Sequence, residues 1–189
     1  MKTIPPLKAT IFRAVFLLII VICVSSCKKN TPIETSLKNE TFTKNEKEEI
    51  EAFFFIATAN VSKSIISKSQ IAQQKSSDIN IQELSEKIEF QQSNLLEEVN
   101  KMANKKLIII TEINPTHKRD LYDLIDAADI GFKKAYLNSM AQSLNEQINL
   151  LESISKETND KTILKLVLQY LPGQYQLLRE TEQINREYI

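Results

Sequence analysis

The sequence predicts an all-α protein: a bundle of four long helices, with a short additional helix between the second and the third. Three observations support this fold class. After residue 44 the chain contains only two glycines, Gly131 and Gly173, and no tryptophan. It has almost no strand-like alternation of apolar and polar residues, while apolar residues recur at three- and four-residue spacing. Residues 132–154 separate apolar from polar side chains most cleanly, so we expect them to form the central helix.

The first 27 residues indicate a lipoprotein signal peptide. The basic residues Lys2, Lys8 and Arg13 precede an apolar run of 11 residues, 14–24. Small residues then follow before Cys27. The run is shorter than the about 20 residues that a helix needs to cross a bilayer, which disfavours an uncleaved membrane anchor. The Val-Ser-Ser-Cys ending resembles a bacterial lipobox. This resemblance implies that Cys27 is diacylated and becomes the mature N-terminus.

Removal of this segment limits the chemistry of the mature chain. Cys23 is lost and Cys27 carries lipid, so no thiol remains for a disulfide, a metal site or a nucleophile. Three positive charges leave with the segment, and 21 Lys+Arg remain against 24 Asp+Glu, a net charge of −3 with His neutral. The sequence shows no basic stripe, so we expect no nucleic-acid partner.

Residues 28–44 are expected to be a flexible tether, because they are polar, contain Pro32 and show little apolar periodicity. In some lipoproteins, acidic residues after the lipidated cysteine resemble a surface-export signal, and an aspartate directly after it retains others at the inner membrane. Here these positions hold Lys28 and Lys29, which match neither pattern. By this resemblance we expect the protein to be lipid-anchored at the periplasmic face of the outer membrane. Residues 45–189 then form the helical-bundle domain.

The first helix is predicted from Asn45 to Gln74. A second apolar face, formed by Phe55, Ala59 and Ile66, lies on its far side. Three explanations remain open: the tether or residues 107–110 cover this face, a second copy or an envelope partner binds it, or it is exposed. We therefore treat it as a candidate partner surface. The expected core stripe of this helix consists of Ile50, Phe53, Phe54, Ala57, Val61, Ile65, Ile71 and Ala72.

The second helix is predicted to reach Asn104, with Ser77 or Asp78 as its N-cap. Residues 107–110 form an apolar, extended run, and Asn114 and Pro115 begin a short helix of about 11 residues. The second helix has a core stripe of Ile81, Leu84, Ile88, Leu95, Val99 and Met102, with Gln92 on the same face, and a solvated face that includes Glu83, Glu86, Glu89, Glu97 and Glu98.

Asp129 is expected to cap the central helix, and residues 158–160 to form its exit turn. The last helix should run to near Glu187, with a kink or local loosening at Pro172 and Gly173. The central helix should bury Leu137, Met140, Ala141, Leu144, Ile148 and Leu151, extended by Phe132, Tyr136, Leu150 and Ile154. The last helix should bury Ile163, Leu166, Val167, Tyr170, Leu177 and Ile184.

Three segments carry a family resemblance: IAQQKSSDINIQELSEKI (71–88), FKKAYLNSMAQSLNEQINLLE (132–152) and LKLVLQYLPGQYQLLRE (164–180). Together they resemble the domain of unknown function 4142 family, whose members are exported, helical bacterial proteins. The Phe-x-x-x-Tyr before the central helix and the Leu-Pro of the last helix are its strongest parts. The resemblance covers about residues 53–181. It implies a ferritin-like four-helix bundle and no established activity.

The same resemblance implies where a metal site would lie. The family carries histidines in the second helix, in the central helix and after the Leu-Pro. The matching positions here hold Gln92, Leu144 and Leu177, and the acidic position of the first helix falls near Ile65 or Ser67. None of these residues is the family's ligand, so the resemblance implies that any metal site has been lost and that no cofactor is bound.

The residues themselves give the same expectation. A di-iron bundle needs Glu-x-x-His pairs on facing helices, and the sequence contains none. The only histidine, His117, is expected to be in solvent, beside Lys118 and Arg119. There is no Gly-x-Ser-x-Gly turn and no glycine-rich phosphate loop. We therefore expect no catalytic residue and no enzymatic activity.

Two classes of function remain. The first is a lipid-anchored structural or interaction module, held at the membrane to meet an envelope protein or a second copy of itself. The alternative is a ligand-binding bundle, which accepts an apolar small molecule or, despite the absent ligands, a metal. The Leu- and Ile-rich stripes favour the first class, because they are able to fill the interior.

Overall fold

The computed structural model describes residues 34–110 and 112–187. The signal peptide, Cys27 and residues 28–33 of the expected tether lie outside this part of the chain. The described residues form five helices and no strand: α2 (Glu34–Lys75), α3 (Ile79–Lys105), α4 (Pro115–Asp126), α5 (Asp129–Glu157) and α6 (Lys161–Glu187). The predicted all-α class is confirmed.

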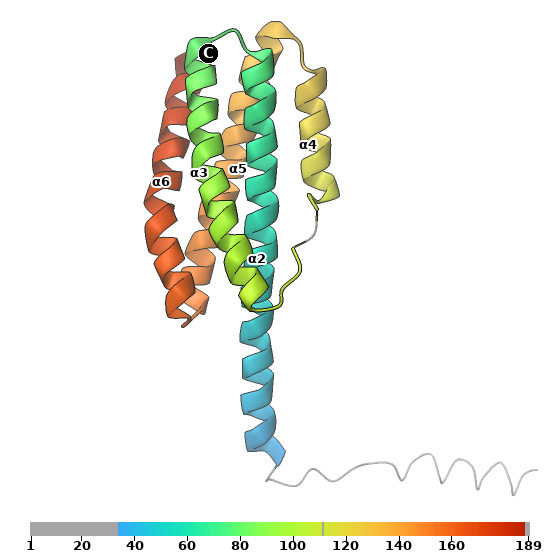
Figure 1. Ribbon diagram of the computed structural model, residues 1–189, viewed down its shortest axis with the longest axis vertical. Coiled ribbons are helices and arrows are strands. Elements are labelled where there is room, and N and C mark those ends of the chain that lie inside the picture. The colour runs from blue at the N-terminus through green and yellow to red at the C-terminus, as the bar shows by residue number, and fades with distance from the viewer. Residues whose placement is uncertain (1–33, 111, 188–189) are drawn as a thin grey trace, which may run out of the picture. The chain divides into compact units, whose positions relative to one another are not determined.

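Residues Lys44–Ile189 form one compact unit. In it the four long helices α2, α3, α5 and α6 pack side by side, and α4 lies on the outside of this bundle (Figure 1). The short helix α4 falls between the second and third long helices in chain order, as predicted. The four-helix bundle follows from the apolar stripes of four long helices, which bury one another.

The start of α2 differs from the prediction. The helix begins at Glu34 rather than Asn45, so residues 34–44, which were expected to belong to a flexible tether, are helical. No proline or glycine follows Pro32 in this segment. Glu34 and Glu40 each stand four residues before a lysine, a spacing that stabilises a helix by about 0.2–0.5 kcal/mol per pair. Both features favour a helix in this segment, although its polar composition suggested a tether.

The predicted N-cap of α3 and the predicted start of α4 are confirmed. The backbone N–H of Asn80 donates to Asp78 Oδ1 at 3.0 Å, and that of His117 donates to Asn114 Oδ1 at 2.9 Å. The predicted cap of α5 is wrong. Asp129 is the first helical residue, Ala128 occupies the N-cap position, and no side chain caps it. The helix starts one residue early because the carbonyl of Ala128 already accepts the N–H of Phe132 at 3.3 Å.

The C-terminus of α3 leads into the apolar run at residues 107–110. The N–H of Leu107 donates to Asn104 O at 3.1 Å and that of Ile108 to Ala103 O at 2.9 Å, which is the Schellman pattern. Leu107 takes the left-handed position of this motif, with φ 59°, where glycine is usual. A non-glycine residue there costs about 1–2 kcal/mol. This left-handed residue turns the chain sharply after α3, and Ile108 and Ile110 pack against the bundle.

The predicted stripe of the central helix is confirmed almost entirely. Its core residues are at most 2% exposed, except Ala141 and Leu150, which are half-buried. Two apolar clusters fill the bundle, and both draw on all four long helices. One contains Val61, Ile65, Ile81, Ile88, Phe132, Tyr136, Leu137, Met140, Leu144 and Leu177 among others. The other contains Phe54, Phe55, Ala59, Leu95, Val99, Leu151, Ile154, Ile163, Leu166 and Val167 among others.

Most of the predicted core stripe of α2 is buried or half-buried, but Phe53 and the expected partner surface were assigned incorrectly. Phe53, predicted in the core, is 66% exposed, whereas Phe55 and Ala59, proposed as a partner surface, are fully buried. Ile66 is half-buried. Ile108 and Ile110 pack against the cluster that contains Phe55 and Ala59. Phe55 and Ala59 are therefore buried within the same chain, which agrees with the first of the three explanations in that no partner is needed to cover them.

Candidate functional site: a buried polar layer and an open groove

One polar side chain from each long helix meets in the middle of the bundle. These are Ser62 of α2, Gln92 of α3, Gln147 of α5 and Gln174 of α6, and all four are fully buried. Gln92 Nε2 donates to Gln174 Oε1 at 2.5 Å. Ser62 Oγ lies 3.0 Å from Gln92 Oε1 and 3.4 Å from Gln147 Oε1, and its single proton serves one of them at a time. We call these four residues the polar layer.

Of the three positions that the resemblance singled out, only Gln92 lies in the polar layer. Leu144 and Leu177 are fully buried in an apolar cluster. Sequence reasoning missed Gln147 and Gln174, although each stands three residues from one of those leucines along the buried face, a spacing that could have identified them. Within residues 34–110 and 112–187, no three His, Cys, Asp or Glu side chains gather where they could hold a metal ion.

A charged cluster lies where α4 covers the bundle. Lys68 of α2 is 1% exposed, and its Nζ donates to Ser143 Oγ at 2.8 Å and lies 3.7 Å from Asp120 Oδ2 of α4. Loss of hydration on burial lowers the pKa of Lys68, against the opposing fields of Asp120 and Glu146. Solvent scarcely reaches Lys68 or Ser143, so their pairing gives no accessible nucleophile.

His117 belongs to the same region, and its predicted position in solvent is wrong. It is 6% exposed, and its Nε2 lies 3.9 Å from Glu146 Oε1. The reason is the periodicity of α4: His117 and Leu124, seven residues apart, form the one face of this short helix that packs on the bundle.

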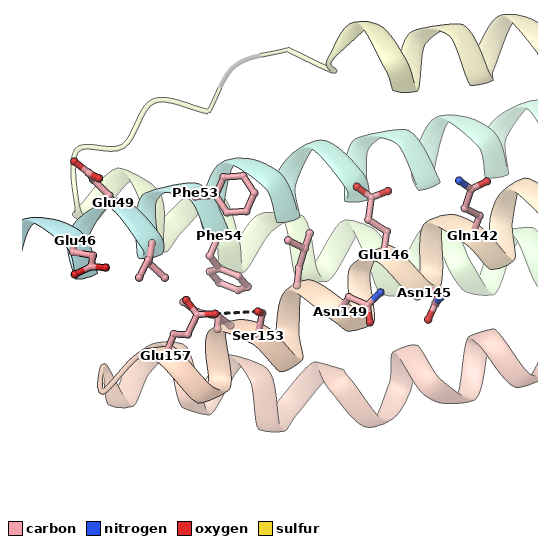
Figure 2. Close-up of a pocket in the computed structure, with 13 residues that line it drawn as sticks. Glu46, Glu49, Phe53, Phe54, Gln142, Asn145, Glu146, Asn149, Ser153 and Glu157 are labelled. Carbon is pink, nitrogen blue, oxygen red and sulfur yellow. Dashed lines mark hydrogen bonds between the residues drawn. The ribbon is translucent and has the colours of Figure 1, made fainter.

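An open groove runs between α2 and α5, with a volume of about 790 Å³ (Figure 2). Its apolar wall comes from both helices, and Phe53 is its most exposed member. Glu146 lines it and also faces His117, so the groove adjoins the first turn of α4. The lining residues are Glu46, Glu49, Ile50, Phe53 and Phe54 of α2, and Gln142, Asn145, Glu146, Asn149, Leu150, Ser153, Ile154 and Glu157 of α5.

The charge of the groove has one sign. Figure 2 shows Glu46 and Glu49 on α2 and Glu146 and Glu157 on α5 around the apolar side chains. Among the described residues that line the groove, none is a lysine, arginine or histidine. Ser153 Oγ donates to Glu157 Oε1 at 3.0 Å, which leaves the second oxygen of that carboxylate available. The groove therefore combines an apolar floor with an acidic rim.

A second cavity, of about 640 Å³, lies beside the junction of α4 and α5. Lys75, one of the three lysines that line it, has a structural role. Lys75 Nζ donates to the carbonyl oxygens of Leu124, Ile125 and Ala127 at 3.3, 2.5 and 2.8 Å, and it lies 5.1 Å from the centre of the Phe132 ring. A cation at this place donates hydrogen bonds to the last carbonyl groups of α4 and interacts favourably with the negative end of its helix dipole.

Among the described residues, Glu46–Lys75 is the one helical segment long and apolar enough to cross a membrane. Half of its most apolar window is buried inside the bundle, as in the core helix of a globular domain. Its apolar character is accounted for by the two clusters that it joins.

These observations define a class of protein: a helical bundle with a hydrogen-bonded polar layer in its interior and a groove with an acidic rim on its surface. The chain belongs to the DUF4142 family, a domain of unknown function, whose family model matches residues 40–184. The predicted family is thus confirmed. No curated protein matches the chain.

The fold has a solved relative, the crystal structure of a DUF305 fragment from Deinococcus radiodurans. The TM-score is 0.65, and the superposition covers 73% of this chain and 96% of that chain. The sequences are 14% identical, so the likeness concerns the helical fold alone.

Proposed function

We propose that this protein is a lipid-anchored, non-enzymatic interaction module of the cell envelope, and that it binds its partner in the groove between α2 and α5. The groove is the observation that supports this function. It exposes Phe53 at 66% beside a row of carboxylates, whereas the polar layer and Lys68 are sealed inside the bundle. Exposed apolar side chains in a polar rim are typical of interaction sites.

The anchor is proposed from the sequence pattern that ends at Cys27. A Cys27→Ser variant tests it by detergent-phase partitioning. The parent protein should enter the detergent phase. The variant should stay in the aqueous phase, because it lacks the cysteine to which the lipid would be attached. Partitioning of the variant with detergent would show that another part of the chain holds the membrane.

The interaction itself is tested by photo-crosslinking in cells. A photoreactive residue in place of Phe53 should give one discrete crosslinked product. The same residue in place of Phe90, which is 68% exposed on α3, is the matched control and should not give it. Identical products from both positions, or none from Phe53, would contradict a partner in the groove.

The volume of the groove supports a second candidate function. About 790 Å³ lies within the range of about 300–1,000 Å³ that small-molecule sites occupy. In this alternative the bundle carries an apolar small molecule. Native mass spectrometry of the purified protein would show a mass added to the chain, and Phe53→Ser would remove it.

A further inference from the structure

We propose that the occupant of the groove is a short, cationic, amphipathic helix of a partner protein. This inference rests on the proposed function and gives the partner its chemistry. The first argument is charge. Four carboxylates, those of Glu46, Glu49, Glu146 and Glu157, surround the groove, and no cationic side chain stands among its described lining residues. A partner with lysines or arginines complements this field and meets the groove faster.

The same field disfavours other occupants. A symmetric dimer through this face would place the carboxylates of one copy against those of the other, because a two-fold interface joins identical patches. An anionic lipid surface or a nucleic acid would meet the same repulsion. A neutral apolar molecule would use the floor and leave the acidic rim without a role.

The second argument is shape. Both walls of the groove are helices, α2 and α5 (Figure 2). A third helix fits such a pair by packing its side-chain ridges between theirs. The part of the groove between the carboxylates of Glu146 and Glu157 follows α5 for about 17 Å, at 1.5 Å per residue, which is about three turns of helix. A partner helix of about 12–14 residues would span this part.

The protein itself supplies a precedent. Its own α4 has 12 residues and lies on the bundle next to the groove. It is held by two buried side chains, His117 and Leu124, and by the ion pair of Asp120 with Lys68, while His117 Nε2 lies 3.9 Å from Glu146 Oε1. A docked helix would use the same means with opposite sign, because the bundle offers carboxylates at the groove where it offers Lys68 to α4.

The third argument is the apolar floor. Phe53 is 66% exposed, and Ile50 and Leu150 are half-buried beside it. An amphipathic helix presents apolar side chains at i, i+3, i+4 and i+7, which would cover these residues and place its lysines at the rim. Burial of an exposed aromatic ring at the centre of such a contact carries a large share of the binding free energy.

The test uses the mature chain with Cys27→Ser and a defined probe, a capped 14-residue Leu/Lys amphipathic peptide with a fluorescent label. Fluorescence anisotropy should show binding that weakens with added salt. A Leu/Glu peptide of the same pattern should not bind. Phe53→Ser should weaken binding at least tenfold, while Phe90→Ser, at an equally exposed phenylalanine of α3, should leave it unchanged.

The role of charge has its own matched pair. Glu49→Gln with Glu157→Gln should weaken binding at least fivefold and reduce its salt dependence. Glu86→Gln with Glu97→Gln, two exposed glutamates of α3, changes the net charge equally and should change neither. All four substitutions lie on the surface, so thermal unfolding should be unaltered and confirms that the variants are folded.

Equal binding by the Phe53→Ser and Phe90→Ser variants would overturn the inference, and so would equal binding of the Leu/Glu peptide. If the crosslink from position 53 then persists in cells, the interaction function stands and only the cationic helix is wrong. If that crosslink is also absent, the proposed function fails with it.

Discussion

Lys68 of α2 donates a hydrogen bond to Ser143 of α5, with 2.8 Å between Nζ and Oγ, at a depth where Lys68 is 1% and Ser143 3% exposed. The nearest carboxylate, Asp120 of α4, stands 3.7 Å from the ammonium group and is itself one-third exposed. Three helices thus meet at one buried charge. A hydroxyl and a partly solvated carboxylate replace its hydration only in part, so we expect this lysine to cost stability.

We predict that Lys68→Met leaves the free energy of unfolding at pH 7 unchanged or raises it by about 1 kcal/mol, because methionine fills a similar volume without a dehydrated charge. Asp120 can remain hydrated when its partner is lost. Urea denaturation of both proteins measures the difference. A loss above about 2 kcal/mol would mean that the charged contacts of Lys68 outweigh its desolvation.

The same variant should also change how the free energy of unfolding depends on pH. In the unfolded chain Lys68 takes up a proton below its ordinary pKa of 10.5, whereas burial lowers the pKa in the folded state. Between the two values the unfolded state binds more protons, so the contribution of Lys68 to stability rises with pH across this interval and is constant below it. The difference between the parent and Lys68→Met should therefore shrink as pH approaches 10.5 from below. A difference independent of pH would show that the ammonium group is not penalised by burial.

The polar layer yields a second prediction. Gln92→Leu removes the donor that serves Gln174 Oε1 and leaves this buried carbonyl unpaired. An unsatisfied buried group costs about 1–3 kcal/mol, and we expect a loss of this size in the free energy of unfolding.

The control for this loss is the double variant Gln92→Leu with Gln174→Leu. Gln174 Nε2 has no hydrogen-bond partner in the described structure, so its removal also eliminates an unpaired buried donor. The double variant should be more stable than Gln92→Leu alone. Additive losses in a double-mutant cycle would show that the two amides act independently.

The third prediction concerns two phenylalanines on opposite sides of α2. Phe55→Ala should lower the free energy of unfolding by about 3–5 kcal/mol, because Phe55 is fully buried beside Phe54 and leaves a cavity. Phe53→Ala, at a 66% exposed ring, should change it by less than about 0.5 kcal/mol. Thermal or urea unfolding measures both, and similar losses would contradict the assignment of the two faces.

These two phenylalanines also show how far the sequence predicts the fold. The helices α3 and α5 have one apolar stripe each, and periodicity placed their core residues correctly. The helix α2 is apolar on more than one side, and periodicity alone cannot tell which side faces the bundle. Burial shows that Phe55 rather than Phe53 faces the bundle. Ile108 and Ile110, in the irregular segment after the left-handed residue Leu107, pack against the cluster that contains Phe55.

The candidate site was less accessible to sequence reasoning. Gln142, Asn145 and Asn149, which line the groove on α5, lie outside the apolar stripe predicted for this helix and are exposed. That these residues face Phe53 across a groove depends on the register between α2 and α5 and on where α4 begins, and neither is encoded in one helix. Of the polar layer only Gln92 was singled out, because it interrupts an apolar stripe. Gln147 and Gln174 also stand at core spacing but were missed.

The last prediction concerns Lys75 and the local stability of α4. This helix has only 12 residues and two buried side chains, so it should open more readily than the long helices. Lys75→Met removes the three hydrogen bonds that Nζ donates to the carbonyl groups at the C-terminal end of α4. It also removes the positive charge over the ring of Phe132. We expect amide hydrogen exchange across residues 118–126 to accelerate about 5- to 30-fold, equivalent to about 1–2 kcal/mol. Exchange in α3 should not change. Lys101→Met, at an exposed lysine of α3, is the control and should leave α4 as protected as in the parent. Uniform acceleration over the whole bundle in Lys75→Met would show that Lys75 supports global stability rather than the attachment of α4.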